Sequence, residues 1–139
     1  MIDPTGTGVS DMSQLANFYD AALGALGLQR RSSCPRMMGR TASGLDYPVF
    51  WIDRFHAYGQ NIHTAFAARS RNEVEAFQAA AIRAGGVDND ALVLRDTSTG
   101  HPPGYYAAFF LDPDGKRRSC IPRTLKSVFR ARRTRDCAR

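Results

Sequence analysis

The sequence contains two copies of one pattern, offset by 59 residues, so that Asp11 aligns with Ser70 and Gly27 aligns with Gly86. Each copy has a capping residue, an apolar stripe at helical spacing and a glycine that ends the helix. The stripes consist of Leu15, Phe18, Tyr19, Ala22, Leu23 and Leu26, and of Val74, Phe77, Ala80, Ala81 and Ala84. Any two amphipathic helices can be aligned, but the shared cap, stripe, stop and preceding strand favour a duplicated unit. Two copies are too few for a solenoid.

Several other segments have the character of strands. Residues 62–68 form a run without glycine or proline, 49–52 are apolar, and 105–111 are aromatic-rich and end at a turn over 112–115. Residues 31–47 are expected to form a loop or short hairpin, and 88–104 a mobile connection. Each unit is then a strand, a helix and two or three further strands. This order predicts an α+β fold with helices on one face of a mostly antiparallel sheet.

Length and composition are those of one globular domain. The chain has 139 residues, with 43% hydrophobic and 23% charged residues. No run approaches the ~20 apolar residues of a membrane-spanning helix, and the first residues lack the pattern of a secretory signal. The three cysteines, Cys34, Cys120 and Cys137, are odd in number and show no CxxC or zinc-knuckle spacing. We therefore expect a cytoplasmic protein in a reducing compartment.

The positive charge is confined to the end of the chain. The net charge is +6. Residues 1–115 hold more acidic than basic side chains, whereas 116–139 hold many cations and only Asp136 to oppose them. A basic tail can attract nucleic acid or an acidic partner, but Phe129 is its only aromatic ring, so stacking platforms for nucleic-acid bases are missing. Nucleic acid is therefore not an expected partner.

Three segments, taken in order, resemble the vicinal oxygen chelate superfamily. They are 8–11 leading into Phe18 and Tyr19, then 63–66, then 105–109 before the 112–115 turn. This superfamily includes glyoxalase I (lactoylglutathione lyase), extradiol dioxygenases, fosfomycin-resistance transferases and bleomycin-binding proteins. The resemblance implies two βαβββ modules, here 1–52 and 60–115, whose mostly antiparallel sheets curl around a cleft that a dimer partner often completes.

The resemblance also implies a divalent metal, held by histidine and glutamate from the first and last strand of each module. His63 stands at the second-module histidine position. Pro4 and Ser119 occupy the positions of the first-module histidine and the second-module glutamate, and 49–52 offer no carboxylate. His63 is therefore the one candidate metal ligand, and we expect the metal to be absent or weakly bound in this chain. A single histidine on a strand can equally be a cleft or core residue with one hydrogen bond.

Aromatic residues are the other site candidates. Trp51 and Tyr105 are expected to line an apolar ligand pocket, although packing alone would also explain them. His56 and His101 match no ligand position and are expected at the surface, and Cys34 has no base beside it.

Two functions follow from the resemblance. One is metal-assisted chemistry on a small oxygenated substrate, as in lyases, isomerases and dioxygenases, through a site degraded in this chain. The alternative is a metal-free protein that binds a small molecule, such as a drug, in the same cleft. Both imply a small-molecule ligand and a homodimer, without a membrane.

The last residues do not match a closing strand. Lys116, Arg117 and Arg118 place three cations in a row, and Pro122 follows soon after. The codons for 117–121 can be chosen so that reading one base later gives Val-Glu-Ala-Ala-Phe, which restores the missing glutamate. We therefore separate a domain over 1–115 from an atypical tail over 116–139 that a frameshift would explain. The alternative is an authentic basic arm, helical over 125–133, for an acidic partner.

Overall fold

The computed structural model describes residues 5–32, 40–57, 59, 62–94, 98, 100–101 and 103–122. Each half of this part of the chain is a strand, a helix and three more strands. The elements are β1 (Thr5–Gly8), α1 (Met12–Gly24), β2 (Gln29–Ser32), β3 (Arg40–Gly44), β4 (Pro48–Asp53), β5 (His63–Ala68), α2 (Arg71–Arg83), β6 (Val87–Leu94), β7 (Tyr106–Leu111) and β8 (Arg117–Pro122).

The two halves form sheets with matching strand order. The first sheet has the order β1-β4-β3-β2 and the second has the order β5-β8-β7-β6. In each sheet the first strand runs parallel to the last, and the other neighbours are antiparallel. This topology confirms the α+β class and the two βαβββ modules. The sheets are not strongly curled, which corrects the expected curl.

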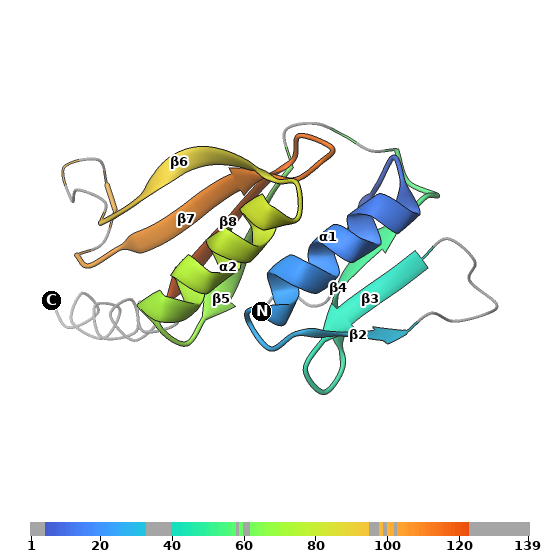
Figure 1. The fold of residues 1–139 in the computed structure, drawn as a ribbon, viewed down its shortest axis with the longest axis horizontal. Coiled ribbons are helices and arrows are strands. Elements are labelled where there is room, and N and C mark those ends of the chain that lie inside the picture. The colour runs from blue at the N-terminus through green and yellow to red at the C-terminus, as the bar shows by residue number, and fades with distance from the viewer. Residues whose placement is uncertain are drawn as a thin grey trace, which may run out of the picture.

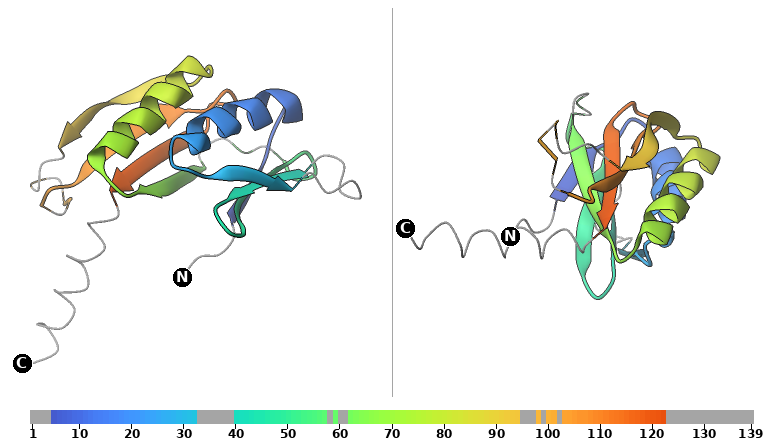
Figure 2. Two further views of the ribbon diagram at one scale, coloured as in Figure 1. Left: turned by 60° about the horizontal axis from the view of Figure 1, so that its bottom comes forward. Right: turned by 90° about the vertical axis from the view of Figure 1, so that its left-hand side faces the viewer.

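Both helices lie on one side of the sheets. Figure 1 shows α1 and α2 side by side in front of the strands, and the views of Figure 2 show that both helices cover the same side. Side chains of a strand alternate between its faces, so Phe50 and Ile52 enter the core while Trp51 points away from the helices. We call this second side, which carries Trp51, His63 and Arg117, the open face.

The predicted caps determine where the helices begin. The Asp11 side chain accepts a hydrogen bond from the Gln14 N–H at 2.8 Å, and Ser70 accepts from the Glu73 N–H at 3.2 Å. Each bond satisfies one of the free N–H groups of a first helical turn. Gly27 follows α1 with a φ of 76°, a left-handed conformation that glycine adopts without steric cost.

The apolar stripes meet in a core that both modules share. Phe110 of β7 contacts Phe18 of α1 at 5.9 Å and Phe77 of α2 at 5.1 Å between ring centroids. All three rings are buried. Burying such a side chain stabilises a fold by roughly 1.5–3 kcal/mol, so the repeat positions Phe18 and Phe77 help to join the two halves.

Two strands differ from the expectations. Residues 87–94 form β6, where a mobile connection was expected over 88–104. Asp88 and Asp90 interrupt the alternation of apolar residues that would have predicted a strand here. β6 is at the edge of its sheet, where polar residues can remain in water. Residues 117–122 form β8, between β5 and β7, so the second module continues past the boundary placed at residue 115.

None of the helices in the described part of the chain has the length and apolar character of a membrane-spanning segment.

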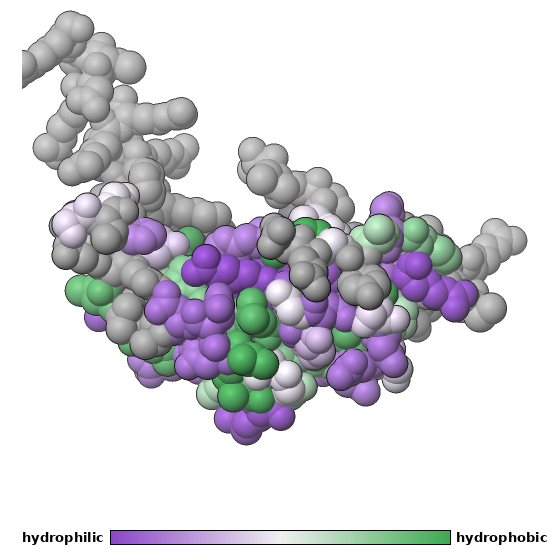
Figure 3. Space-filling view, turned by 90° about the horizontal axis from the view of Figure 1, so that it is seen from above, coloured by the Kyte–Doolittle hydropathy of each residue, from purple (hydrophilic) through white to green (hydrophobic). Residues whose placement is uncertain are grey.

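In the view from above, the surface of the described residues is mostly hydrophilic, with a hydrophobic patch near the centre (Figure 3).

Candidate functional site

His63 and Ser119 are neighbours on the open face. They come from the adjacent parallel strands β5 and β8, in which Ala65 pairs with Ser119. The Nε2 atom of His63 lies 2.8 Å from the Oγ atom of Ser119, within hydrogen-bond distance. Two positions that the family resemblance singles out, 56 residues apart in sequence, therefore meet in space.

The surroundings of His63 are cationic. Burial and the nearby guanidinium groups of Arg117 and Arg118 hold the pKa of His63 below its usual value. Both burial and neighbouring positive charges disfavour the protonated, positively charged imidazole. His63 is therefore a neutral imidazole near pH 7.

Arg117 and Phe109 complete this part of the open face. The Arg117 guanidinium lies 4.4 Å from the centre of the Phe109 ring, a cation–π contact. The Phe109 ring in turn lies 6.0 Å from the His63 ring. We call His63, Ser119, Arg117 and Phe109 the open-face cluster.

The strand pairing of the first sheet shows which residue occupies the position equivalent to Ser119. Gly6 of β1 pairs with Trp51, as Ala65 of β5 pairs with Ser119. Trp51 is thus the counterpart of Ser119, and it carries no metal donor. Pro4, the counterpart of His63, lies outside the described residues.

These side chains do not fit a divalent ion. The open-face cluster offers one imidazole, whose Nε2 is already hydrogen-bonded, and a neutral hydroxyl beside cations. Within the described part of the chain, no three His, Cys, Asp or Glu side chains lie close enough to hold a metal. Hard or borderline divalent ions require more anionic or imidazole donors than this.

Trp51 and Tyr105 lie in different modules. Trp51 lines an open cavity of about 480 Å³ at β1 and β4. Tyr105 precedes β7, where its ring stacks on that of His101 with centroids 4.7 Å apart. His56 is exposed, as expected, but it contacts the Asp53 carboxylate at 2.9 Å. This pair was not predicted from the sequence, although an aspartate three residues before a histidine in a turn is a usable signal.

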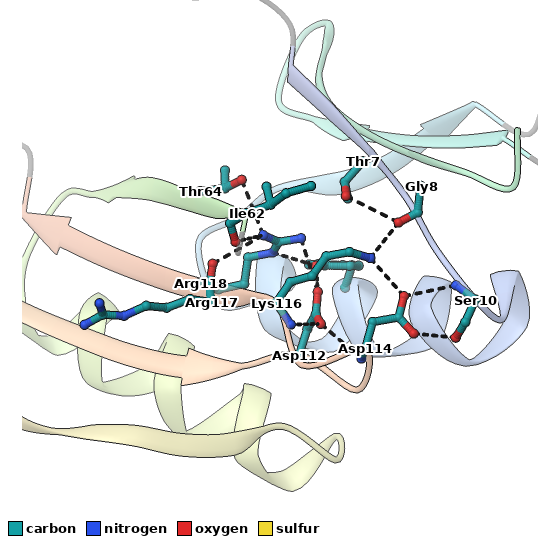
Figure 4. A network of polar contacts seen from close by, with 11 residues as sticks. Thr7, Gly8, Ser10, Ile62, Thr64, Asp112, Asp114, Lys116, Arg117 and Arg118 are labelled. Atoms are coloured by element: carbon teal, nitrogen blue, oxygen red, sulfur yellow. Dashed lines mark hydrogen bonds and ion pairs between the residues drawn. The ribbon is translucent and has the colours of Figure 1, made fainter. Parts of the chain in front are cut away.

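A buried polar network joins the modules, and sequence reasoning missed it. Asp112 and Asp114 of the turn before β8 face two cations of the same segment (Figure 4). Lys116 and Arg118 are both fully buried. The Lys116 ammonium lies 2.9 Å from Asp114, and the Arg118 guanidinium lies 3.2 Å from Asp112.

The network reaches across to the first module. Lys116 donates to the Gly8 carbonyl at 2.6 Å, and Asp114 accepts from the backbone N–H of Ser10 at 3.0 Å. The Tyr19 hydroxyl donates to Asp112 at 2.5 Å and accepts from the Arg118 Nε at 2.7 Å. Burial raises the pKa of Tyr19 well above its usual value, so this hydroxyl keeps its proton.

Comparison with solved structures agrees with this architecture. A glyoxalase/bleomycin resistance protein from Albidiferax ferrireducens T118 superposes with a TM-score of 0.75 and 26% identity, over 88% of this chain and 99% of that chain. A glyoxalase/bleomycin resistance protein/dioxygenase family enzyme from Burkholderia phytofirmans PsJN gives a TM-score of 0.62 at 15% identity, over 87% and 98% of the two chains. Lactoylglutathione lyase from Agrobacterium tumefaciens gives 0.64 at 17% identity, over 90% and 95%.

No protein-family profile matches the sequence, and no curated protein matches it. The structural neighbours are nevertheless glyoxalase/bleomycin resistance/dioxygenase family proteins. The chain therefore has the vicinal oxygen chelate fold and is similar in structure to glyoxalase/bleomycin resistance/dioxygenase proteins.

Proposed function

We propose that this protein binds a small anionic molecule on its open face without a metal ion. The observation that carries the proposal is the His63–Ser119 contact of 2.8 Å beside Arg117, at the place where the family resemblance implies a metal-ligand pair. The exposed Arg117 guanidinium can neutralise an oxyanion, while the Ser119 hydroxyl, which is only 1% exposed, holds the neutral His63 ring beside it.

The charge balance of the open-face cluster supports an anion. Arg117 is exposed on the same face as His63, and among the residues that the structure describes it lies over the Phe109 ring and forms no ion pair with a carboxylate. An arginine without a carboxylate partner can bind a ligand carboxylate through two parallel hydrogen bonds. Phe109 is only 5% exposed beneath the Arg117 guanidinium, so Arg117 and His63 offer most of the exposed surface of the cluster. Benzoate is a simple carboxylate with which to probe it.

The test is a titration of the whole chain with benzoate in the presence of EDTA, followed by the NMR signals of the His63 ring. We expect the signals to shift with saturation, and benzyl alcohol, which lacks the charge, to bind more weakly. Arg117→Gln should weaken benzoate binding by about ten- to a hundred-fold, since a hydrogen bond to a charged group contributes about 1.5–3 kcal/mol.

The matched control is Arg71→Gln. Arg71 also lies over an aromatic ring, that of Tyr106 at 5.3 Å, but at the start of α2. This variant should bind benzoate as the unaltered protein does. Binding that requires an added divalent ion, or equal losses in both variants, would overturn the proposal.

We also propose that the protein forms a homodimer. The support is the family resemblance, in which a partner often completes the cleft, together with the exposed apolar side chains Leu45 and Tyr47, which are 55% and 56% exposed. Light scattering during size-exclusion chromatography tests this, and a mass of one chain would contradict it.

A further inference from the structure

The turn that follows β4 is built around the carboxylate of Asp53. The Asp53 carboxylate accepts hydrogen bonds from the backbone N–H groups of Phe55 and His56, each at 3.0 Å. The same carboxylate lies 2.9 Å and 3.0 Å from the Nδ1 atom of His56. Asp53 is only 3% exposed, so one buried carboxylate shapes the turn and holds the imidazole ring.

This contact determines which nitrogen of His56 carries hydrogen. Burial alone would raise the pKa of Asp53, but the hydrogen bonds from His56 and Phe55 hold it below its usual value, so Asp53 is ionised near pH 7. An ionised carboxylate only accepts hydrogen bonds, and Nδ1 must therefore be the protonated nitrogen. In the neutral ring, Nε2 is then a hydrogen-bond acceptor, on a side chain that is 70% exposed.

A cavity lies beside this pair. It measures about 480 Å³ and is lined by the strand β1, by Trp51, Asp53, His56 and Ala57, and by Ile62. Two glycines of β1 allow its walls to approach. A Cβ on Gly8 would lie 2.1 Å from the His56 carbonyl oxygen, and one on Gly6 would lie 3.2 Å from the Trp51 Cβ.

The lining combines apolar side chains with the oriented imidazole of His56. Trp51 and Ile62 are large apolar side chains, and a pocket of this size matches those that hold small organic molecules. Tryptophan is a preferred stacking surface for planar rings. The acceptor nitrogen of His56 would select a ring that carries a hydrogen-bond donor.

We propose that the Asp53–His56 pair is the polar anchor of a second ligand site, which binds a planar aromatic molecule carrying an O–H or N–H donor next to Trp51. The ligand donates to Nε2 of His56, while Asp53 keeps the ring in the accepting tautomer. This site belongs to the first module and does not depend on the open-face cluster, so either proposal can fail without the other.

The test compares two probes that differ in one hydrogen-bond donor. 4-Methylphenol can donate to His56, and 4-methylanisole has the same ring with the donor replaced by a methoxy group. Calorimetric titration of the whole chain should show binding of 4-methylphenol about three- to ten-fold tighter, which is the size of one hydrogen bond. Trp51 is the single tryptophan, so its indole N–H signal in NMR should shift with the same saturation curve.

Single substitutions distinguish a specific hydrogen bond to His56 from non-specific binding of an aromatic ring. His56→Ala should remove the preference for 4-methylphenol, whereas His101→Ala, which alters a histidine stacked on Tyr105 in the other module, should keep it. Asp53→Asn should also remove the preference, because the new amide donates to Nδ1 and moves the hydrogen of the ring to Nε2. A melting temperature close to that of the unaltered protein shows that each variant is folded.

Three results would overturn the proposal. The first is no binding of either probe, and the second is equal binding of both. The third is a preference that survives in folded His56→Ala.

Discussion

At the residue scale, Lys116 and Arg118 place two fully buried positive charges at and beside β8. Cations in a central strand are costly to bury alone, and the sequence therefore suggested that this segment does not fit the fold. In the structure, Asp112 and Asp114 neutralise Arg118 and Lys116. The turn at 112–115 was predictable from its residues, but its contact with Tyr19, 93 residues away, was not.

Removing one hydroxyl from this network tests its strength. Tyr19→Phe leaves Asp112 and the Arg118 Nε each short of one partner in a buried site. We expect the free energy of unfolding to fall by about 1–3 kcal/mol, measured by urea denaturation. Tyr106→Phe is the control, because its hydroxyl bonds to Glu75 at an exposed position, and it should cost less than about 1 kcal/mol. Equal losses would show that the network adds no special stability.

The acid sensitivity of the fold should reflect Asp114. Burial alone would raise the pKa of Asp114, but hydrogen bonds from Ser10 and Lys116 hold it below its usual value. A carboxyl with a lowered folded pKa stabilises the protein above its unfolded value of about 3.9, and this contribution is lost as pH falls below that value. Thermal unfolding should thus become easier below about pH 4, and Asp114→Asn should reduce this pH dependence. An unchanged pH dependence in the variant would contradict the assignment.

At the element scale, sequence patterns predicted helices better than strands. Both helices begin at the predicted caps, because a cap and an apolar stripe are local signals. The strand β6 was missed because its polar residues alternate poorly. β8 was placed outside the domain because its register with β5 and β7 is a long-range property that no local pattern contains.

The caps themselves can be tested. Ser70→Ala removes the acceptor of the Glu73 N–H at the start of α2 and should lower the free energy of unfolding by about 1 kcal/mol. Ser13→Ala, at an exposed position inside α1, should change it by less than about 0.5 kcal/mol. Chemical denaturation of both variants measures the difference, and no loss in Ser70→Ala would mean that the cap is not needed.

At the scale of the whole molecule, the candidate site was predictable only in part. The family resemblance singled out His63 and Ser119, and the structure brings them together. The family resemblance did not indicate Arg117, Phe109 or the Asp53–His56 pair as site residues, because these contacts depend on how strands and turns meet in space.

The basic segment at the end of the described chain has two possible origins. We propose that the atypical basic segment 116–139, whose first part forms β8, arose by a frameshift or is an authentic basic arm. The expected helix over 125–133 lies outside the described residues. Resequencing the gene and measuring the intact mass distinguish the two origins. A confirmed frame, with a mass of 15.3 kDa, would end the frameshift explanation in its sequencing-error form, and salt-dependent binding of polyanions would then favour the arm.

The central claim is that the open face binds its ligand without a metal ion, and metal content tests it most directly. The protein should be purified without chelators, dialysed against buffer containing zinc, nickel, manganese or ferrous iron, and analysed for bound metal. We predict well below one ion per chain, because His63 and Ser119 provide too few donors to hold a divalent ion against water. One tightly bound ion per chain, lost in His63→Ala, would contradict the account.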